Sequence, residues 1–224
     1  MKGQEQAHCV VALAGERLWL LARKAVYWPA RRLLIIADIH FGKAAAFRAL
    51  GVPVPHGTTT QNLQALDALL AAHDCAEIVF LGDFLHARAA HAAATVAAML
   101  AWRARHPDVL LTVVRGNHDA HAGDPAAALG IRMVDEPHSV GKLSLCHHPD
   151  TVAPGYVLAG HVHPVFHLRA GRGSLRLPCF LLGADRAILP AFGAFTGGHA
   201  VRPAAGERVY VTADAAIFPL PANS

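Results

Sequence analysis

Five short segments of the chain combine carboxylate, imidazole and amide side chains, and each directly follows an apolar run. In chain order they are Asp38-Ile39-His40, Gly82-Asp83, Gly116-Asn117-His118-Asp119, His147-His148 and Gly160-His161-Val162-His163. Short apolar runs predict buried strands, and the ligand-binding groups of an open α/β sheet gather beyond the carboxyl ends of its strands. We therefore expect the five segments to bring their polar side chains close together.

These side chains form a mixed set of oxygen and nitrogen ligands without a thiolate, which favours Mn, with Fe or Zn as alternatives. Two divalent ions about 3.5–4 Å apart need a group that binds both, and Asp83 is the candidate carboxylate. Asp38, His40 and a distal histidine can complete one site, and Asn117 with further histidines can complete the other. In Asp-x-His and His-x-His, alternate residues of an extended chain point to the same side. The sequence therefore predicts a centre for two divalent metal ions.

The apolar pattern also predicts the elements that position these segments. Residues 8–13 and 17–22 are expected to form a hairpin. The next strands are expected at 32–38, 77–83 and 109–114, and helices at 43–50, from Thr58 onward and at 89–105. Thr58 three residues before Gln61 predicts a capping box at the start of the second helix.

Short strands replace long helices after residue 130. They are expected at 142–146, 156–160, 164–169, 174–182, 186–191, 207–212 and 215–220. Strand–helix–strand units indicate parallel sheet, whereas runs of strands indicate antiparallel sheet. The chain is therefore predicted to form a two-sheet α/β sandwich with helices on the outer faces. No shift in composition marks a boundary, so we expect a single domain over residues 1–224.

Composition narrows the class of protein. The chain has 224 residues, of which 54% are hydrophobic and 16% charged, so it can bury a large core and is not a disordered polypeptide. It has no apolar stretch typical of a membrane span, and its first residues, MKGQEQAH, are too polar for a signal peptide. We expect a cytoplasmic protein with no membrane contact. A net charge of +4 from scattered arginines permits a nucleic-acid substrate without indicating one.

The order of the five segments, over residues 32–163, resembles the calcineurin-like metallophosphoesterases. The resemblance implies the metallophosphoesterase fold, a four-layer αββα sandwich of two mixed β-sheets flanked by helices, with a dinuclear metal centre. It implies that one metal is bound by Asp38, His40, Asp83 and His163, and the second by Asp83, Asn117, His147 and His161. It further implies that His118 protonates the leaving oxygen and that Asp119 holds this loop or orients His118.

A narrower resemblance covers about residues 30–200. The segments IADIHFGKAAAFRALGVPVPHGTT, FLGDFLHAR, RGNHD, GHVHP and LPAFGAFTGG are similar to the DNA ligase-associated metallophosphoesterases of bacterial DNA-damage-response clusters. Members of that family are described as phosphoesterases or endonucleases. The resemblance implies a DNA-repair nuclease that hydrolyses phosphodiester bonds of DNA. It also implies a functional association with a DNA ligase, an exonuclease-like protein and a helicase.

One segment departs from the protein phosphatases of the same superfamily, which carry GDxxDRG after the second strand. Here His86 stands where the orienting Asp would be, and the following arginine is displaced to Arg88. This argues against a Ser/Thr protein phosphatase. It also leaves open which group orients His118 and adjusts its acidity. His86 is either a partner of the active-site residues or a plain surface histidine.

Several basic and aromatic residues are candidates for substrate contact. Arg115 can neutralise charge on the phosphoryl oxygens, or it can be a surface arginine. Lys43 and Arg48 follow the first metal-binding segment and can contact phosphate, although a solvated helix face is the simpler interpretation. Phe192 and Phe195 can stack on a base if their glycine-rich segment lines a groove, and otherwise belong to the core.

Two other functions remain open. A phosphodiesterase or phosphatase for small nucleotides, such as cyclic nucleotides or nucleotide sugars, would use the same metals in a narrow pocket rather than an open groove. A non-catalytic scaffold of this fold should have lost ligands or the acid, whereas His118 and all seven metal-binding positions are present.

Overall fold

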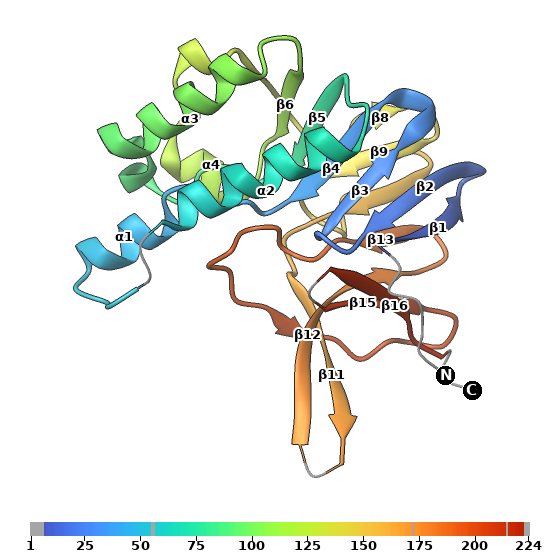
Figure 1. The fold of residues 1–224 in the computed structure, drawn as a ribbon. Coiled ribbons are helices and arrows are strands. Elements are labelled where there is room, and N and C mark those ends of the chain that lie inside the picture. Colours follow the sequence, from blue (N-terminus) through green and yellow to red (C-terminus); the bar gives the residue numbers. More distant parts are fainter. Residues whose placement is uncertain (1–6, 55–56, 172, 214, 222–224) are drawn as a thin grey trace.

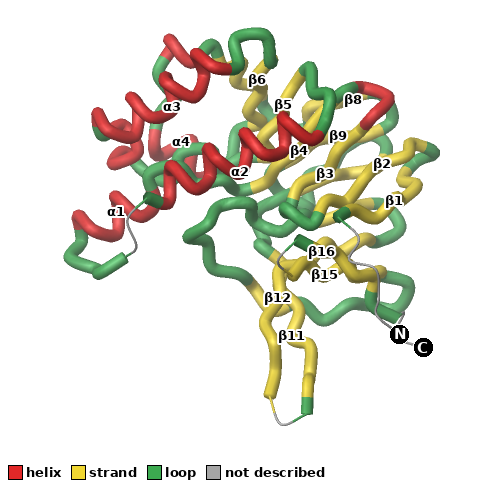
Figure 2. Tube along the Cα trace, in the orientation of Figure 1, coloured by secondary structure: helices red, strands yellow, loops and turns green. Residues whose placement is uncertain are grey.

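The computed structural model describes residues 7–54, 57–171, 173–213 and 215–221. Its centre is two β-sheets packed against each other, with the α-helices gathered on one side (Figure 1). The predicted two-sheet sandwich is therefore confirmed. Figure 2 shows the same arrangement, with the α-helices at the upper left of the view and α2 running across the strands of the first sheet.

The first sheet has seven strands in the order β1-β2-β3-β4-β5-β6-β7. Strands β1 to β4 pair antiparallel, and β4 to β7 pair parallel, so the sheet is mixed. The bounds are β1 His8–Leu13, β2 Glu16–Leu21, β3 Ala25–Trp28, β4 Leu33–Ala37, β5 Glu77–Leu81, β6 Leu110–Val114 and β7 Ile131–Val134. The expected hairpin of β1 and β2 is present, whereas β3 and β7 were not predicted.

The second sheet has nine strands, with the main order β14-β11-β12-β13-β10-β9-β8 and with β15 and β16 attached through β12. Its strands β9, β10 and β13 pair parallel, and most of the others pair antiparallel. The bounds are β8 His138–Val140, β9 Leu143–Cys146, β10 Tyr156–Ala159, β11 Pro164–Ala170, β12 Gly173–Leu182, β13 Arg186–Ile188, β14 His199–Ala200, β15 Arg208–Ala213 and β16 Ala216–Pro219.

The helices lie within residues 29–129 of the described chain. The α-helices are α1 Lys43–Ala49, α2 Thr58–Ala72, α3 Ala93–Arg105 and α4 Asn117–Ala122, and the short 3-10 helices are η1 Pro29–Arg31, η2 Arg88–His91 and η3 Ala127–Leu129. Side chains of α2, α3 and α4 pack on the first sheet. The helical cover of the αββα arrangement is thus seen on one outer face among the described residues.

Two apolar layers hold the sandwich together. Between the sheets, Trp28 and Leu158 are fully buried and pack with Phe180. Between the first sheet and the helices, Phe80 packs against Leu66 of α2. Burying a side chain of this size contributes about 1.5–3 kcal/mol. The strands that carry the polar segments are therefore fixed from both faces.

The structure corrects two details of the predicted helices. The capping box at Thr58 is wrong, because Gly57 occupies the N-cap position and no side chain caps the helix. Thr58 is already the first helical residue, where its hydroxyl cannot cap. The helix expected at 89–105 begins only at Ala93, after the separate turn η2.

No helix in the described parts of the chain is both long and apolar enough to cross a membrane. Residues 1–6, which carry most of the segment used to argue against a signal peptide, lie outside the described residues.

Candidate metal centre

The loops that follow β4, β5 and β6 of the first sheet meet the loops that follow β9 and β10 of the second. Asp38 directly follows β4, Asp83 follows β5 by two residues, and Asn117 begins α4 just beyond β6. His147 directly follows β9, and His161 follows β10 by two residues. All seven residues predicted as metal ligands therefore come from five strand ends, as the sequence pattern indicated.

Four of these side chains converge as a first donor group. One ligand atom from each of Asp38, His40, Asp83 and His163 lies within 4.8 Å of the others. The Nε2 atoms of His40 and His163 are 3.3 Å apart, and His163 Nε2 is 3.5 Å from Asp38 Oδ1. Asp83 Oδ2 is 3.7 Å from His40 Nε2. Asp38, His40 and Asp83 are buried, and only His163 is partly exposed.

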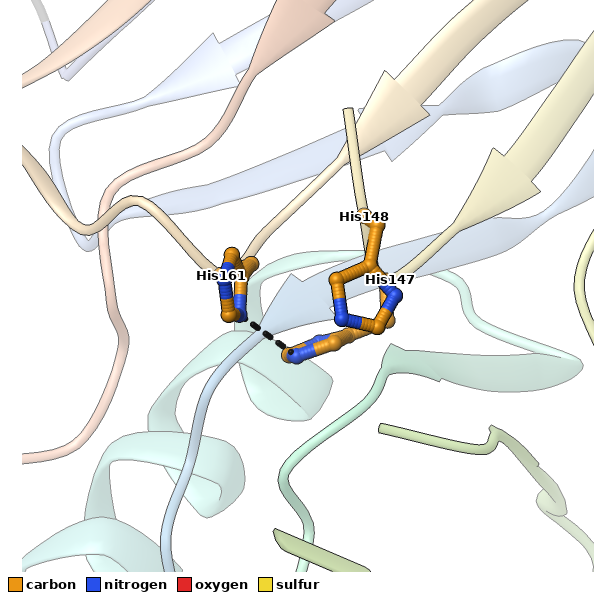
Figure 3. Close-up of side chains that lie close together, drawn as sticks. All are labelled: His147, His148 and His161. Carbon is orange, nitrogen blue, oxygen red and sulfur yellow. Dashed lines mark hydrogen bonds between the residues drawn. The ribbon is translucent and has the colours of Figure 1, made fainter. Parts of the chain in front are cut away.

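The remaining predicted ligands form a second donor group around His147, which is fully buried. His147 Nε2 is 2.8 Å from Asn117 Oδ1. It lies 3.0 Å from His161 Nδ1, the contact drawn as a dashed line in Figure 3. It is also 3.6 Å from Asp83 Oδ1. The two oxygens of Asp83 therefore face different donor groups, Oδ1 the second and Oδ2 the first, which is the placement expected of a shared ligand.

Not all of these ligand atoms have a hydrogen to share, although His161 Nδ1 can donate to His147 Nε2. His147 Nδ1 lies 3.1 Å from the Leu81 carbonyl oxygen and donates to it, which leaves Nε2 as an acceptor facing the Asn117 oxygen. Asp38 Oδ1 is buried and has no hydrogen-bond partner. Buried acceptors without donors are costly. A cation among these atoms would satisfy them, so the donor set fits divalent metal ions.

Burial shifts the pKa values of these side chains toward their neutral forms. Desolvation lowers the pKa of His147 to about 4 and that of His40 well below its ordinary value, so both imidazoles are neutral, the form that binds metal. Desolvation also raises the pKa of Asp83, and it outweighs the hydrogen bond that the carboxylate accepts from the His118 backbone. A bound divalent ion would reverse that shift.

The backbone of the predicted ligands is strained. Of eight non-glycine residues with positive φ in the described chain, five are predicted metal ligands, with φ between 48° and 68°. Such conformations cost about 1–3 kcal/mol each and persist where the surrounding structure enforces them, often at functional sites. The five residues are Asp38, His40, Asp83, His161 and His163.

Two glycines make room for the carboxylates. A Cβ atom on Gly160 would lie 2.6 Å from Asp38 Oδ2, and one on Gly116 would lie 2.5 Å from Asp83 Oδ1. Neither glycine was predicted as a site residue. The available signal was that each stands immediately before a ligand, in Gly160-His161 and Gly116-Asn117.

His118 lies at the edge of the cluster with its ring held in place. Its Nδ1 is 2.8 Å from the His86 carbonyl oxygen and donates to it, while Nε2 is 3.9 Å from Asp83 Oδ2. The His86 ring stacks on the His118 ring, with centroids 4.6 Å apart. Desolvation lowers the pKa of His86 to about 4. His86 is thus a partner of His118 rather than a plain surface residue.

Asp119 holds the loop, and no described hydrogen bond or ion pair joins its carboxylate to the His118 ring. Its Oδ1 accepts from the Leu85 backbone N–H at 2.9 Å and its Oδ2 from that of Gly116 at 3.0 Å. The carboxylate therefore ties the loop after β6 to the loop after β5. Its burial raises its pKa to about 6. Of the two roles considered for Asp119, the structure favours holding the loop.

The structure does not bring the predicted arginines into the cluster. Arg115 pairs with Asp124 at 2.5 Å and lies 3.7 Å from Asp135, both exposed carboxylates, so its surface interpretation is favoured. Arg48 is exposed near the end of α1. Arg88 is exposed at the start of η2, and no described hydrogen bond or ion pair joins it to the cluster.

Lys43, in contrast, lies within electrostatic reach of the centre. Its charge contributes to lowering the pKa values of His40 and His86. Burial lowers the pKa of Lys43 itself, while Asp83 and Asp38 act to raise it. Lys43 also lines an open hollow of about 480 Å³ together with Phe47 of α1 and residues 194–197.

The two phenylalanines of the glycine-rich segment have different places. Phe192 is buried in the core beneath the helices. Phe195 lines the hollow beside Lys43 and meets the Phe47 ring edge to face, with centroids 5.7 Å apart. A larger hollow of about 830 Å³ lies between the β1–β2 and β8–β9 turns, and no residue of the cluster lines it.

The sequence analysis did not identify the residues that hold the histidines of the second donor group by hydrogen bonds. Glu136 accepts from the backbone N–H groups of His147 and His148 at 2.7 and 2.9 Å, and its other oxygen is 2.6 Å from His148 Nδ1. His148 in turn offers a ligand atom within 4.8 Å of those of His147 and His161 (Figure 3). The adjacent histidine pair was the only signal, and it does not tell which ring points inward.

Asn62 was missed as well, although it is a buried polar residue on the apolar side of α2. Its side-chain nitrogen donates to the Ile39 carbonyl, and its oxygen accepts from the Ala194 backbone N–H, both at 2.9 Å. Asn62 therefore fixes the loop between Asp38 and His40 to the segment that lines the hollow. In the sequence, the only indication of this role was a polar residue among the leucines of the helix.

Comparisons with known proteins agree with this geometry. A family model for calcineurin-like phosphoesterase matches residues 31–143. The crystal structure of Pseudomonas putida nuclease MPE is 48% identical, with a TM-score of 0.85, and the match covers 95% of this chain and 100% of that chain. A Vps29 variant from Entamoeba histolytica is 13% identical over 84% of this chain and 96% of that chain, with a TM-score of 0.34, too low to support an argument. No curated protein sequence gives a significant match.

Gly160→Ala should weaken metal binding, because the added methyl group would lie 2.6 Å from Asp38 Oδ2 and force that carboxylate to move. We expect the affinity for Mn²⁺, measured by isothermal titration calorimetry, to fall at least about tenfold, as for other supporting groups of metal sites. Gly197→Ala is the matched control, since its Cβ would meet no atom within 4 Å. Equal affinities of the two variants would show that the close approach does not matter.

Proposed function

The chain belongs to the calcineurin-like phosphoesterase family and is a metal-dependent phosphoesterase, and from this premise we propose that it is a nuclease that hydrolyses phosphodiester bonds of DNA. The observation that carries the proposal is the position of Asp83, whose two oxygens face two separate donor groups. The solved nuclease that is similar over nearly the whole chain supports the choice of a phosphodiester substrate.

We assign two divalent ions to this centre, with Mn preferred and Fe or Zn as alternatives. Asp83 is the ligand they would share. The first ion would also be held by Asp38, His40 and His163, and the second also by Asn117, His147 and His161. Such ions supply positive charge beside the phosphoryl oxygens and make hydroxide available at neutral pH.

His118 is the proposed general acid. Because the His86 carbonyl accepts from Nδ1–H, the proton that His118 can give away is the one on Nε2, on the side of Asp83. After that proton passes to the leaving oxygen, the remaining neutral ring is the tautomer that His86 already stabilises. Stacking by the His86 ring limits rotation of His118, so the acid keeps one orientation.

The open hollow beside the centre is the proposed substrate groove. Lys43 would attract a backbone phosphate next to the one being cleaved, and Phe195 with Phe47 offers aromatic surface on which a base can stack. An open groove admits a polymer better than a narrow nucleotide pocket does. The small-nucleotide phosphodiesterase therefore ranks second to the nuclease.

Further parts of the proposal rest on the sequence alone. A role in DNA repair, together with a DNA ligase, an exonuclease-like protein and a helicase, follows only from the resemblance to the ligase-associated family. A single catalytic domain over residues 1–224 and a cytoplasmic location are likewise part of the proposal.

A substrate panel with Mn²⁺ tests the nuclease. We expect cleavage of single-stranded, duplex or nicked DNA together with hydrolysis of bis-p-nitrophenyl phosphate, because the same centre would act on any accessible diester. The panel should also contain p-nitrophenyl phosphate and cyclic nucleotides. Hydrolysis of small esters with every DNA form left intact would refute the nuclease and favour the small-nucleotide enzyme.

Asp83→Ala should remove both metals, because each donor group loses the carboxylate oxygen that faces it. We expect the Mn content of the purified protein, measured by mass spectrometry, to fall from near two per chain to near zero, with activity lost. Asp67→Ala is the control, since it removes a carboxylate that pairs with Arg105 at the protein surface. Metal content near two in Asp83→Ala would contradict the shared-ligand assignment.

His118→Asn should keep both metals. Its turnover should fall most on substrates whose leaving group must be protonated. General acid catalysis contributes roughly 10²–10⁴-fold, so DNA cleavage should fall by about that factor, while esters with a good leaving group such as p-nitrophenolate lose much less. His106→Asn is a matched control, because His106 instead contacts Asp67 between α2 and α3. Equal losses on good and poor leaving groups would remove His118 from proton transfer.

A further inference from the structure

The hairpin of β11 and β12 extends outward from the sandwich (Figure 1). It begins at Pro164, the residue after the predicted ligand His163, so its base adjoins the metal centre. The part of β12 before Cys179 pairs with β11. From Cys179 onward, β12 pairs with β15 and β13 inside the second sheet. Nothing in the proposed catalytic steps uses this hairpin.

The pairing register of the hairpin places its polar and apolar side chains on opposite faces. His167 pairs with Arg176 and Arg169 with Ser174, so these four side chains share one face. All four are exposed. The opposite face is apolar and carries the pairs Phe166–Leu177 and Leu168–Leu175. The alternation places the basic side chains of the described hairpin together on one face.

The charge on this basic face is not balanced by carboxylates. No Asp or Glu stands between Asp150 and Asp185 in the sequence. In the described structure, no ion pair involves His167, Arg169 or Arg176. Arg176 donates instead to a neutral group, the Gly198 carbonyl, at 2.7 Å. Some arginines elsewhere on the surface, Arg32, Arg105, Arg115 and Arg186, pair with carboxylates. Others, such as the exposed Arg17 and Arg88, have no ion pair in the described structure either.

The basic face is continuous with the proposed substrate groove. A Cβ on Gly198 would lie 2.9 Å from Arg176 Nη2 and 2.9 Å from the His163 carbonyl oxygen, so the arginine and the ligand's backbone flank the same residue. The residues just before Gly198, 194–197, line the hollow that contains Lys43. Residues 194–198 therefore connect the hollow that contains Lys43 to Arg176 at the base of the basic face.

We propose that the face formed by His167, Arg169 and Arg176 binds the sugar–phosphate backbone of the DNA strand that is cleaved at the metal centre. This inference rests on the proposed nuclease function and extends it, because it explains how the protein would hold a polymer. Exposed arginines bind phosphates without reading bases, so the binding would be independent of sequence and weakened by salt. A substrate as short as a dinucleotide would not reach the hairpin.

Arg169→Glu tests the proposal, because Arg169 makes no described ion pair whose loss would disturb the fold. Binding of a long, fluorescently labelled single-stranded oligonucleotide with charged, hydrolysis-resistant phosphorothioate linkages is measured by anisotropy with Mn²⁺ present, so that the protein keeps its metals and no cleavage occurs. We expect Kd to rise about tenfold or more at low salt. Substituting both Arg169 and Arg176 by Ala should flatten the plot of log K against log salt, by about 0.7 for each phosphate that the protein no longer neutralises.

Arg17→Glu is the matched control, since Arg17 is exposed near the β1–β2 turn, at the end of the first sheet opposite to the metal-binding loops. Both single variants change the net charge equally. With Mn²⁺, Arg169→Glu should lower kcat/KM on the long oligonucleotide and leave a dinucleotide and bis-p-nitrophenyl phosphate at the rate of the wild-type protein. The preference for long over short substrates should shrink accordingly.

The outcomes separate this proposal from the function on which it rests. If the wild-type protein neither binds nor cleaves DNA, both proposals fail. If it cleaves DNA and Arg169→Glu binds and cleaves as well as Arg17→Glu does, the nuclease stands and the hairpin proposal is overturned. Unchanged DNA binding together with a change of oligomeric state in light scattering would also overturn it, and would assign the hairpin to an interface between two copies of the chain.

Discussion

The buried carboxylate of Asp83 is the group on which the rest of the centre depends. It lies between neutral imidazoles on two sides, with His40 at 3.7 Å from one oxygen and His147 at 3.6 Å from the other. The backbone N–H of His118 donates to Oδ1 at 3.0 Å, but no lysine or arginine among the described residues pairs with this carboxylate. A buried charge without a partner strongly destabilises a fold. A divalent ion bound beside this carboxylate would therefore stabilise the folded chain.

The fold holds the buried Asp83 carboxylate in place because the strands and loops around it are rigid. Strands β4, β5 and β6 pair in parallel and are packed on both faces, so their ends are fixed relative to one another. The loops beyond them are then held by the buried polar groups Asn62 and Asp119, which are not ligands. The half-buried Glu136 holds the loop after β9 in the same way. The strained backbone at the predicted ligands can persist only within such a frame.

The sequence predicted most of the strands and the convergence of the seven ligand positions, because both follow from local apolar patterning and from the direction of parallel strands. It did not predict the short strands β3, β7, β8 and β14. It failed where the outcome depends on tertiary contacts. Arg115 pairs with Asp124 and Asp135, which no spacing rule indicates. The cap at Thr58 is displaced by Gly57, and the supporting groups Asn62 and Glu136 act through backbone atoms distant in sequence.

Strand β12 runs without interruption from the outlying hairpin into the middle of the sandwich. Its residues Phe180 and Leu182 are fully buried between the sheets, whereas Leu175 and Arg176 of the same strand face solvent. The hairpin is therefore a continuation of the core rather than a flap on a flexible joint. A DNA strand that bound there would meet a backbone already held by the core, so the conformational entropy that the protein loses on association would come mainly from its arginine side chains.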